Sequence, residues 1–387
     1  MVRLGDVFTI SSGGTPDKRQ MKYYENGTIP WVKTGDLKKK YVSHNIEQIT
    51  QEGLDNSSAK LFPADTVLVA MYGATIGACS ILDFEASTNQ ACAAFLPTSK
   101  VLPDYLYYFL NSKKDIFVQS GVGGAQPNIS AGYLKKFPFD VKSLDEQKKI
   151  VSALDQIDAV ISLRKQQLAK LDELVKARFV EMFGDPIRNP MGWRIFNLKD
   201  VTCKIGSGAT PKGGKESYQA EGIALIRSMN VHDGQFEYKD LAHLNDDQAE
   251  QLGNVEVCKN DVFINITGAS VARSCIVPCD VLPARVNQHV AIIRCKQSVL
   301  EPIFANQQFL NLSFKKMLLE LGEAGGATRQ AITKQQLEDL NVIIPPFDLQ
   351  EQFSIFTHQI FRQKLTIQQS LDKLEVLKKS LMQEYFG

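Results

Sequence analysis

The sequence of 387 residues has almost no net charge, because 44 lysines and arginines stand against 43 aspartates and glutamates, a formal net charge of +1. A broad basic face, typical of proteins that bind nucleic acid along a whole surface, is therefore not expected. If this chain binds DNA, the contacts must come from local patches of lysine and arginine.

Cysteine and histidine are scarce. The seven cysteines are odd in number and scattered, mostly inside apolar runs such as the one around Cys275, which favours reduced and buried thiols. The five histidines lack the spacing of zinc ligands, so no metal site is expected.

Long hydrophobic runs are also missing, and the N-terminus lacks the apolar segment of a secretory signal. We therefore expect a soluble cytoplasmic protein without a membrane partner. The composition, 44% hydrophobic and 22% charged, is that of a globular protein long enough for two domains.

The stretch from Ser143 to Gly184 has the most regular pattern in the chain. If Arg164 and Arg178 occupy two seam positions, steps of four and three connect Ile150, Leu154, Ile157, Ile161, Leu168, Leu171, Val175 and Met182. This is the heptad pattern of a coiled coil, and Ser143 with Glu146 forms a capping box at its start. Some forty residues make a rod of roughly 60 Å, which one globular core cannot bury.

A second stretch, from Asp348 to Tyr385, has a similar pattern and repeats the capping box with Glu351. Its apolar residues are Phe353, Phe356, Ile360, Ile367, Leu374, Leu377 and Leu381. Each helix needs a partner for its apolar stripe, so we predict that the two pair. The short linker after the first helix favours an antiparallel coiled coil.

Nearly the whole chain is duplicated, with a period of roughly 195 to 205 residues. The recurring segments are 4–16 and 198–211, 29–37 and 223–231, 65–81 and 261–276, Asn89-Gln90 and Asn287-Gln288, and 123–130 and 325–333. Each copy ends in a long helix and a Phe-Gly pair, at Phe183 and Phe386. Each copy is therefore a domain followed by a rod.

Within a copy, strand-like runs at 66–71 and 262–266 and helical spacing at 101–118 and 302–321 indicate mixed α and β structure. We predict an α+β fold with an internal pseudo-two-fold repeat. Its parts are a domain at 1–142, a helix at 143–184, a second domain at 185–346 and a second helix at 347–387. Two unlike domains at a fixed distance suit two DNA half-sites, while a scaffold that joins two proteins is the alternative.

Five motifs together resemble the specificity subunit of type I restriction-modification systems. They are Ser11-Ser-Gly-Gly-Thr-Pro16, Ile29-Pro-Trp-Val-Lys-Thr-Gly-Asp36, Gly73-Ala-Thr-Ile-Gly77, Asn89-Gln90 and Asp145-Glu-Gln147. The resemblance covers both copies, although the second copy has Ile223-Ala-Leu-Ile-Arg227 and Gly268-Ala-Ser-Val-Ala272 at the matching places.

The resemblance implies two target-recognition domains that read a bipartite double-stranded DNA sequence, with a spacer set by the helices. It also implies two adenine-N6 methyltransferase subunits as partners, with restriction subunits joining that core. In such a family, S-adenosylmethionine, ATP, magnesium and catalysis belong to the partners, so we expect no cofactor and no catalytic residue in this chain.

Two short motifs come close to catalytic patterns. Pro345-Pro346-Phe347 follows Ile344, which cannot hold the amine of a flipped adenine as the Asn or Asp of a methyltransferase motif would. Pro16-Asp17 with Asp36-Leu37-Lys38 fits the loose template of a metal-dependent nuclease, which stays an alternative function. The second copy has Lys212 and Asn230 at the two acidic positions and cannot hold a metal in the same way.

If the domains read DNA, lysines and arginines should contact phosphates, and Arg, Lys, Asn and Gln should contact base edges. The first copy offers Lys33, Thr34, Lys38, Lys39, Lys40, Tyr41, Thr75, Gln126 and Asn128. The second copy offers Arg227, Ser228, Ser270, Arg273, Arg329 and Gln330. Asn89-Gln90 and Asn287-Gln288 persist in both copies, which fits a shared structural hydrogen bond better than readout of two different half-sites.

Since the resemblance implies partner subunits docked on the helices, we expect outward-facing residues there to contribute. The candidates are Leu163, Arg164, Lys170, Phe361 and Lys364. A role in pairing the two helices, or simply in facing solvent, is the alternative for each.

Overall fold

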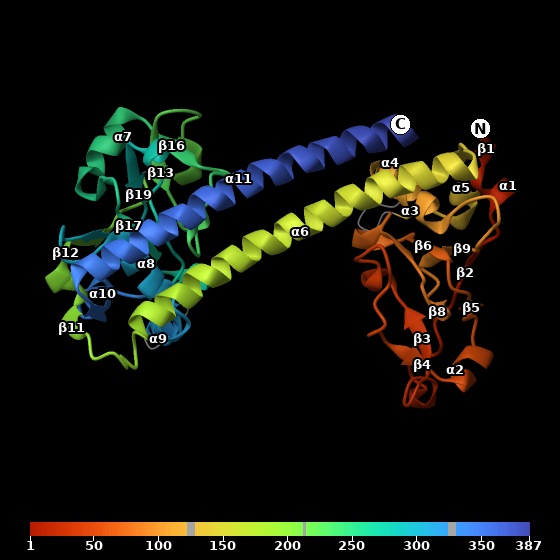
Figure 1. Cartoon of the computed structure of the whole chain (residues 1–387), viewed down its shortest axis with the longest axis horizontal. Helices are drawn as coiled ribbons and strands as arrows, with labels where there is room; N and C mark the ends of the chain where they lie inside the picture. Colours follow the sequence, from red (N-terminus) through yellow and green to blue (C-terminus); the bar gives the residue numbers. More distant parts are fainter. Residues whose placement is uncertain (122–127, 212–213, 324–329) are drawn as a thin grey trace. The chain divides into compact units, whose positions relative to one another are not determined.

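The computed structural model describes residues 1–121, 128–211, 214–323 and 330–387. The chain forms two compact units: the first unit comprises Met1–Lys165 and Gln369–Gly387, and the second comprises Gln166–Gln368. Each unit contains a sheet domain, part of the long helix α6 (Leu144–Phe183) and part of the long helix α11 (Phe347–Phe386) (Figure 1).

The first unit is built on two four-stranded sheets, with strand orders β2-β9-β6-β7 and β4-β3-β8-β5, and a short β1-β10 pair. The strands are β1 (Val2–Arg3), β2 (Ile10–Ser12), β3 (Ile29–Val32), β4 (Gln48–Ile49), β5 (Leu61–Phe62), β6 (Val67–Ala70), β7 (Cys79–Ile81), β8 (Ala86–Thr88), β9 (Cys92–Phe95) and β10 (Pro138–Phe139). Its short helices are α1 (Leu4–Val7), α2 (Gln51–Asp55), α3 (Pro103–Ser112), α4 (Lys114–Gln119) and α5 (Ala131–Lys136).

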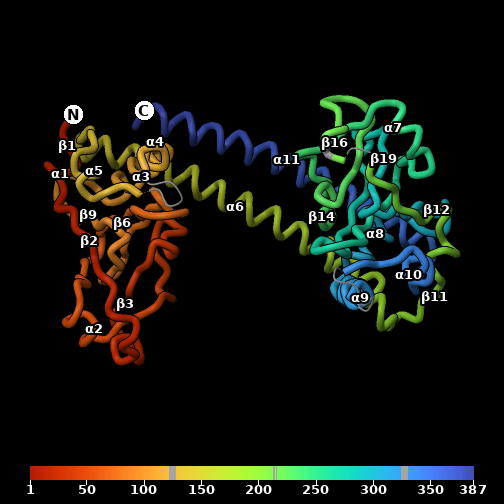
Figure 2. The backbone as a smooth tube through the Cα atoms, turned by 180° about the vertical axis from the view of Figure 1, so that it is seen from behind, coloured from red at the N-terminus to blue at the C-terminus, as the bar shows by residue number. Residues whose placement is uncertain are grey.

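The second unit, whose backbone is traced in Figure 2, repeats this plan. Its sheets are β12-β20-β17-β18 and β16-β13-β19, with a β11-β21 pair and a β14-β15 pair. The strands are β11 (Arg194–Asn197), β12 (Thr202–Ser207), β13 (Ile223–Ile226), β14 (Val231–His232), β15 (Gln235–Phe236), β16 (Ala242–Leu244), β17 (Val262–Asn265), β18 (Ser274–Ile276), β19 (Ala284–Val286), β20 (Val290–Cys295) and β21 (Asn341–Ile344). Its short helices are α7 (Asp246–Gln251), α8 (Pro302–Leu310), α9 (Leu312–Glu323) and α10 (Lys334–Glu338).

The two units share one connectivity. The pair β3-β8 is parallel and so is its counterpart β13-β19, while the sheets β2-β9-β6-β7 and β12-β20-β17-β18 are antiparallel. Each stretch of helical spacing forms two helices rather than one. In the second unit the break falls at Asn311, whose extended backbone (φ −58°, ψ 139°) ends α8. The predicted α+β class with an internal repeat is confirmed.

The long helices pair antiparallel, as predicted. In the first unit, Lys165 of α6 forms an ion pair with Glu375 of α11 at 2.9 Å. In the second unit, the Phe179 ring of α6 lies 5.6 Å from the Phe353 ring of α11.

The seam of α11 differs from the prediction at one position. Leu377, which the apolar pattern assigned to the seam, is 48% exposed, whereas Leu371 is buried. Steps of three and four through Leu371 lead to Lys364 and Lys378, which bond Asp172 and Asp158 on α6. Because lysine occupies seam position 378, a pattern built only from apolar residues selects the neighbouring Leu377 instead. Polar seam pairs of this kind specify the register of a coiled coil.

The phenylalanine of each repeated Phe-Gly pair is buried in the core of one unit. Phe183, at the end of α6, is completely buried in the core of the second unit, where its ring lies 4.8 Å from the Phe304 ring and 5.6 Å from the Phe353 ring. Phe386, at the end of α11, is buried in the first unit, 5.3 Å from the Tyr105 ring. Each sheet domain therefore packs against the start of one long helix and the end of the other.

A buried glutamine ties the start of each long helix to the loop before α3 or α8. Gln147 accepts a hydrogen bond from the Leu102 N–H at 2.8 Å and donates to the Lys100 and Lys142 carbonyls at 3.0 and 2.8 Å. Gln350 repeats all three bonds in the second unit. Both side chains are inaccessible to solvent, so this polar tie is part of the core.

Candidate nucleic-acid interface

Each unit presents the repeated Gly-Ala-Thr or Gly-Ala-Ser turn just beyond the end of a central strand. Gly73–Thr75 follows β6, and Gly268–Ser270 follows β17. The two glycines have φ values of +67° and +71°, which favour glycine, and a Cβ at either position would have no neighbour within 4 Å. The turns therefore offer open backbone to a ligand.

In the second unit this turn borders a hollow of about 520 Å³. The hollow brings together four residues that the sequence predicted as DNA contacts: Ser228, Ser270, Arg273 and Gln330. Met229, Thr267, Gly268, Ala269, His289 and Ala331 complete its lining. We call this set the second-unit hollow.

Arg273 is the strongest cation of the hollow. Its backbone is fixed, because its N–H donates to the Ser270 carbonyl at 3.2 Å and its carbonyl accepts from the Asn265 N–H at 2.8 Å. Its half-buried guanidinium has no ion-pair partner within the described part of the chain. An arginine held this way can bind a phosphate or the O6 and N7 edge of guanine.

Two further side chains add hydrogen-bonding groups. The Thr267 hydroxyl lies 2.5 Å from His289 Nδ1, and Gln330 donates through Nε2 to Glu323 at 2.9 Å. The Gln330 carbonyl accepts from the Gly268 N–H at 2.8 Å, which ties this residue to the turn. The hollow therefore combines a cation, an imidazole, an amide and hydroxyls around exposed backbone.

The matching place in the first unit carries different chemistry. Counted from the repeated motifs, Ala78 stands where the second unit has Arg273, and Ala91 stands where it has His289. Tyr72, 44% exposed, replaces Thr267 and bridges to Asn128, while the Thr75 hydroxyl donates to the Tyr72 carbonyl at 3.3 Å. The same backbone thus presents an aromatic ring and small side chains in place of a cation.

Lys33 and Arg227 occupy equivalent positions at the end of β3 and β13, each followed by a short turn that begins at Thr34 or Ser228. Lys33 forms an ion pair with Glu47 at 2.5 Å, and Arg227 donates to the Asp240 carbonyl and lies 5.4 Å from the Tyr218 ring. Both cations are therefore held on the protein surface.

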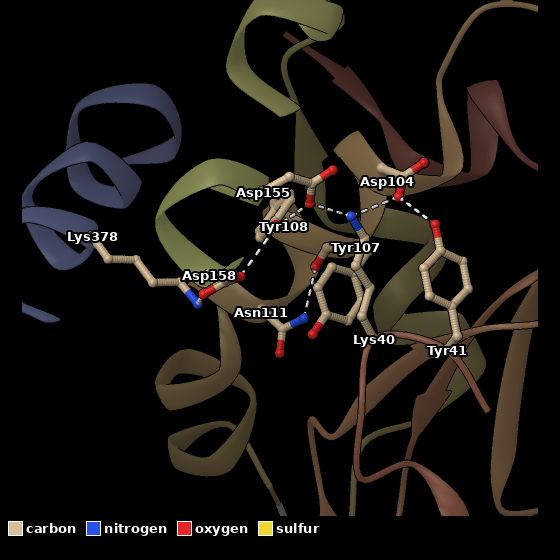
Figure 3. Close-up of polar contacts among 9 residues, drawn as sticks. All are labelled: Lys40, Tyr41, Asp104, Tyr107, Tyr108, Asn111, Asp155, Asp158 and Lys378. Atoms are coloured by element: carbon tan, nitrogen blue, oxygen red, sulfur yellow. Dashed lines mark hydrogen bonds and ion pairs between the residues drawn. The ribbon is translucent and has the colours of Figure 1, made fainter. Parts of the chain in front are cut away.

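The three lysines that follow the turn Thr34–Asp36 have different surroundings. Lys38 and Lys39 are exposed and form no ion pair with any residue that the structure describes. Lys40, by contrast, lies between Asp104, at 2.7 Å, and Asp155 (Figure 3). The Tyr41 hydroxyl donates to Asp104 at 2.9 Å. Burial and this carboxylate raise the pKa of Tyr41, so its hydroxyl stays protonated.

Gln126 and Arg329 lie outside the described residues. Asn128 is exposed at the edge of that gap.

Both carboxylates of the nuclease template already have other partners. Asp17 forms a two-pronged ion pair with Arg19, whose Nε and Nη2 lie 3.0 and 2.8 Å from its oxygens, and this hydrogen bonding lowers the pKa of Asp17. Asp36 accepts from the Lys33 N–H at 2.8 Å and caps its own turn. Within the described ranges, no three His, Cys, Asp or Glu residues gather in a way that could hold a metal.

The long helices expose apolar side chains near the predicted partner contacts. In the first unit, Leu163 is 62% exposed and Val160 39%, one turn apart on α6. In the second unit, Phe361 is 41% and Leu365 61% exposed, one turn apart on α11. Lys364 bonds Asp172, Arg164 is half-buried, and Lys170 is exposed.

No helix in the described part of the chain has the length and hydropathy needed to cross a membrane.

Sequence reasoning missed His289, Thr267 and Tyr72. The available signal was their position, since His289 directly follows the repeated Asn287-Gln288 and Thr267 directly precedes the repeated turn. A residue that changes between copies beside a motif that does not change is a candidate for copy-specific readout.

Residues 1–173 and 190–376 match the family of type I restriction modification DNA specificity domains. The chain belongs to this family. The type I restriction enzyme MjaIX specificity subunit of Methanocaldococcus jannaschii is 25% identical over 98% of this chain and 90% of the relative.

Solved structures share the fold of this specificity subunit. A chain from work on complex assembly and conformational transition of the type I R-M system matches with a TM-score of 0.62 at 17% identity, covering 100% of this chain and 96% of the other. The type I restriction-modification S subunit from M. genitalium matches with a TM-score of 0.57 at 14% identity, covering 100% and 95%.

The family membership confirms the predicted role. The chain is a DNA specificity subunit of a type I restriction-modification system, and the catalytic activities of such a system lie in its modification and restriction subunits. Assembly with partner subunits and DNA is implied by the family.

Proposed function

We propose that each unit reads one part of an asymmetric bipartite DNA target, and that the subunit directs adenine-N6 methylation or cleavage there by its partners. The observation that carries this proposal is one repeated Gly-Ala-Thr or Gly-Ala-Ser turn surrounded by different side chains in the two units. A shared backbone suits a shared DNA shape, while different side chains suit different bases.

Within this proposal, Arg273, His289 and Gln330 of the second-unit hollow read the second half-site, with Ser228 and Ser270 near the backbone of the DNA. In the first unit, Thr34 and Thr75 stand at the positions of Ser228 and Ser270 and contact the DNA there, and Asn128, at the position of Ala331, reads the first half-site. Lys33, Lys38, Lys39 and Arg227 contribute attraction to phosphates, a contribution that falls with added salt.

Replacement of Arg273 by alanine is expected to weaken methylation of the cognate target about 5-fold to 150-fold, since one good contact of arginine to a base is worth about 1–3 kcal/mol. The loss should relax the base preference at one position of one half-site. The reconstituted complex would be assayed on a library in which every base of both half-sites is varied.

Lys296→Ala is the matched control, because this lysine of the same unit bonds the Asp200 carbonyl and is not part of the hollow. It should leave both half-sites unchanged. If Arg273→Ala altered both half-sites equally, or neither, the assignment of the hollow to one half-site would be wrong.

We also propose that two methyltransferase subunits dock on the exposed apolar faces of α6 and α11, with Leu163 and Arg164 contributing in the first unit and Lys170, Phe361 and Lys364 in the second. The support is the exposed pair Val160 and Leu163 and the exposed pair Phe361 and Leu365, which leave apolar surface open to solvent. S-adenosylmethionine, ATP and magnesium would be bound by the partners.

Leu163→Asp is expected to reduce co-purification of a tagged modification subunit at least about tenfold, because a carboxylate cannot be buried in an apolar interface without a partner. Ala169→Asp places the same charge at an exposed position on another face of α6 and should have little effect. Intact co-purification with Leu163→Asp, or an equal loss with Ala169→Asp, would contradict this docking site.

A further inference from the structure

A polar network in the first unit joins the sheet domain to both long helices (Figure 3). The residues of this network come from four separate segments. They are Lys40 from the loop after the turn Thr34–Asp36, Asp104 and Tyr108 from α3, Asp155 and Asp158 from α6, and Lys378 from α11. We call these six residues the first-unit network.

Lys40 is the link on the side of the sheet. Its carbonyl accepts from the Ile81 N–H at 2.7 Å, so its backbone is fixed to the edge of β7. Its ammonium contacts the carboxylates of Asp104 and Asp155 and lies 4.9 Å from the Tyr108 ring centroid. One side chain therefore connects the sheet to α3 and α6.

Tyr108 connects the two carboxylates of α6. Its hydroxyl lies 2.5 Å from Asp155 Oδ1 and 3.1 Å from Asp158 Oδ2, while Lys378 of α11 lies 2.5 Å from Asp158 Oδ1. Burial, followed by the bond to Asp155, raises the pKa of Tyr108, so the hydroxyl keeps its proton for this bridge. The chain of contacts is thus continuous from β7 to α11.

The second unit lacks this network. Counted from the buried glutamines and the prolines that begin α3 and α8, His358 replaces Asp155, Phe361 replaces Asp158 and Gln307 replaces Tyr108. These three residues line a cavity of about 440 Å³ instead. The second unit ties the equivalent loop to α9 by an ion pair between Asp233 and Lys315. Among the described residues, the chain of contacts from Lys40 through Tyr108 to both α6 and α11 therefore has no counterpart in the second unit, which instead bonds its sheet domain to α11 through Glu301 and Ser354.

We propose that the first-unit network is a positioning device for DNA recognition: it fixes the angle of the first sheet domain on α6 and α11, and so the distance at which the first half-site is read. This inference rests on the proposed bipartite readout. It assigns Lys40 to positioning rather than to a phosphate contact, since two carboxylates already hold its ammonium.

Charged hydrogen bonds suit this task because they are strong and add geometric specificity. The chosen substitutions should leave the sheet core intact, because Tyr108→Phe keeps the buried ring and its contact with Tyr107, and Lys40 is not part of the apolar core. The expected effect is a wider range of accepted spacings and not a loss of folding.

The test measures methylation by the reconstituted complex on targets whose spacer between the half-sites is the cognate length, one base pair shorter or one base pair longer. Lys40→Met and Tyr108→Phe should raise the rate on the altered spacers, relative to the cognate spacer, by about tenfold, the effect of losing one charged hydrogen bond. Lys40→Arg, which keeps the charge and both contacts, should restore the wild-type preference.

Lys22→Met is the control, because it breaks an exposed ion pair with Glu52 of α2 in the same domain, and neither residue belongs to the first-unit network. It should behave as the wild type. If Lys40→Met fails to fold, Tyr108→Phe decides, since it removes one oxygen and keeps the ring. Folded variants that retain the wild-type spacer preference would overturn the inference. A wild-type complex that methylates no bipartite target would instead refute the proposed function itself.

Discussion

Replacement of Phe183 by alanine is expected to lower the free energy of unfolding of the second unit by about 3–5 kcal/mol. The side chain is completely buried, and its ring lies 5.3, 4.8 and 5.6 Å from the rings of Phe179, Phe304 and Phe353. Its removal leaves a cavity in an aromatic cluster that holds the end of α6 in the sheet domain.

Trp193 provides the probe for this experiment, since its indole N–H donates to the Phe183 carbonyl at 3.0 Å. The sequence contains two tryptophans, so a Trp31→Phe background leaves the fluorescence of Trp193 to report unfolding in denaturant. Val180→Ala, at a position of α6 that is 49% exposed, should change stability by less than about 0.5 kcal/mol. Equal effects of the two substitutions would contradict the buried role of Phe183.

Replacement of Gln147 by leucine is expected to destabilise the first unit by about 3 kcal/mol or more. Leucine fills a similar volume but leaves the Leu102 N–H and the Lys100 and Lys142 carbonyls without their partner. Each buried backbone group that loses its hydrogen bond costs about 1–3 kcal/mol.

The fluorescence of Trp31 in a Trp193→Phe background would follow this loss. Gln156→Leu makes the same substitution at an exposed position of α6 and serves as the control. Because Gln350 makes the same three bonds in the second unit, Gln350→Leu should lower the stability of that unit by a comparable amount. Wild-type stability of Gln147→Leu would show that the polar tie is dispensable.

The repeat and the long helices were predictable because their signals are local and periodic. Seam residues such as Ile150 and Ile161 are buried as the heptad pattern requires. The pattern failed at Leu377 because the seam there uses Lys378, whose aliphatic stem and cross-helix ion pair replace an apolar side chain.

The candidate interface was predictable only in part, for a physical reason. Ser228, Ser270, Arg273 and Gln330 were found through the repeat, because both copies place the same turn at the same point. The partners of Lys40 were not, since Asp104 and Asp155 are distant in the sequence and only the packing of α3 and α6 brings them to it. A run of lysines in a sequence does not distinguish a cation open to phosphate from one already paired.

The role of this chain in target choice is tested by a genome-wide map of N6-methyladenine in the source cell, with and without this gene, with the cognate modification subunit supplied in both. We expect one asymmetric bipartite motif to lose its methylation when the gene is removed and to regain it when the gene is restored. An unchanged map, in a cell where the modification subunit is present, would contradict it.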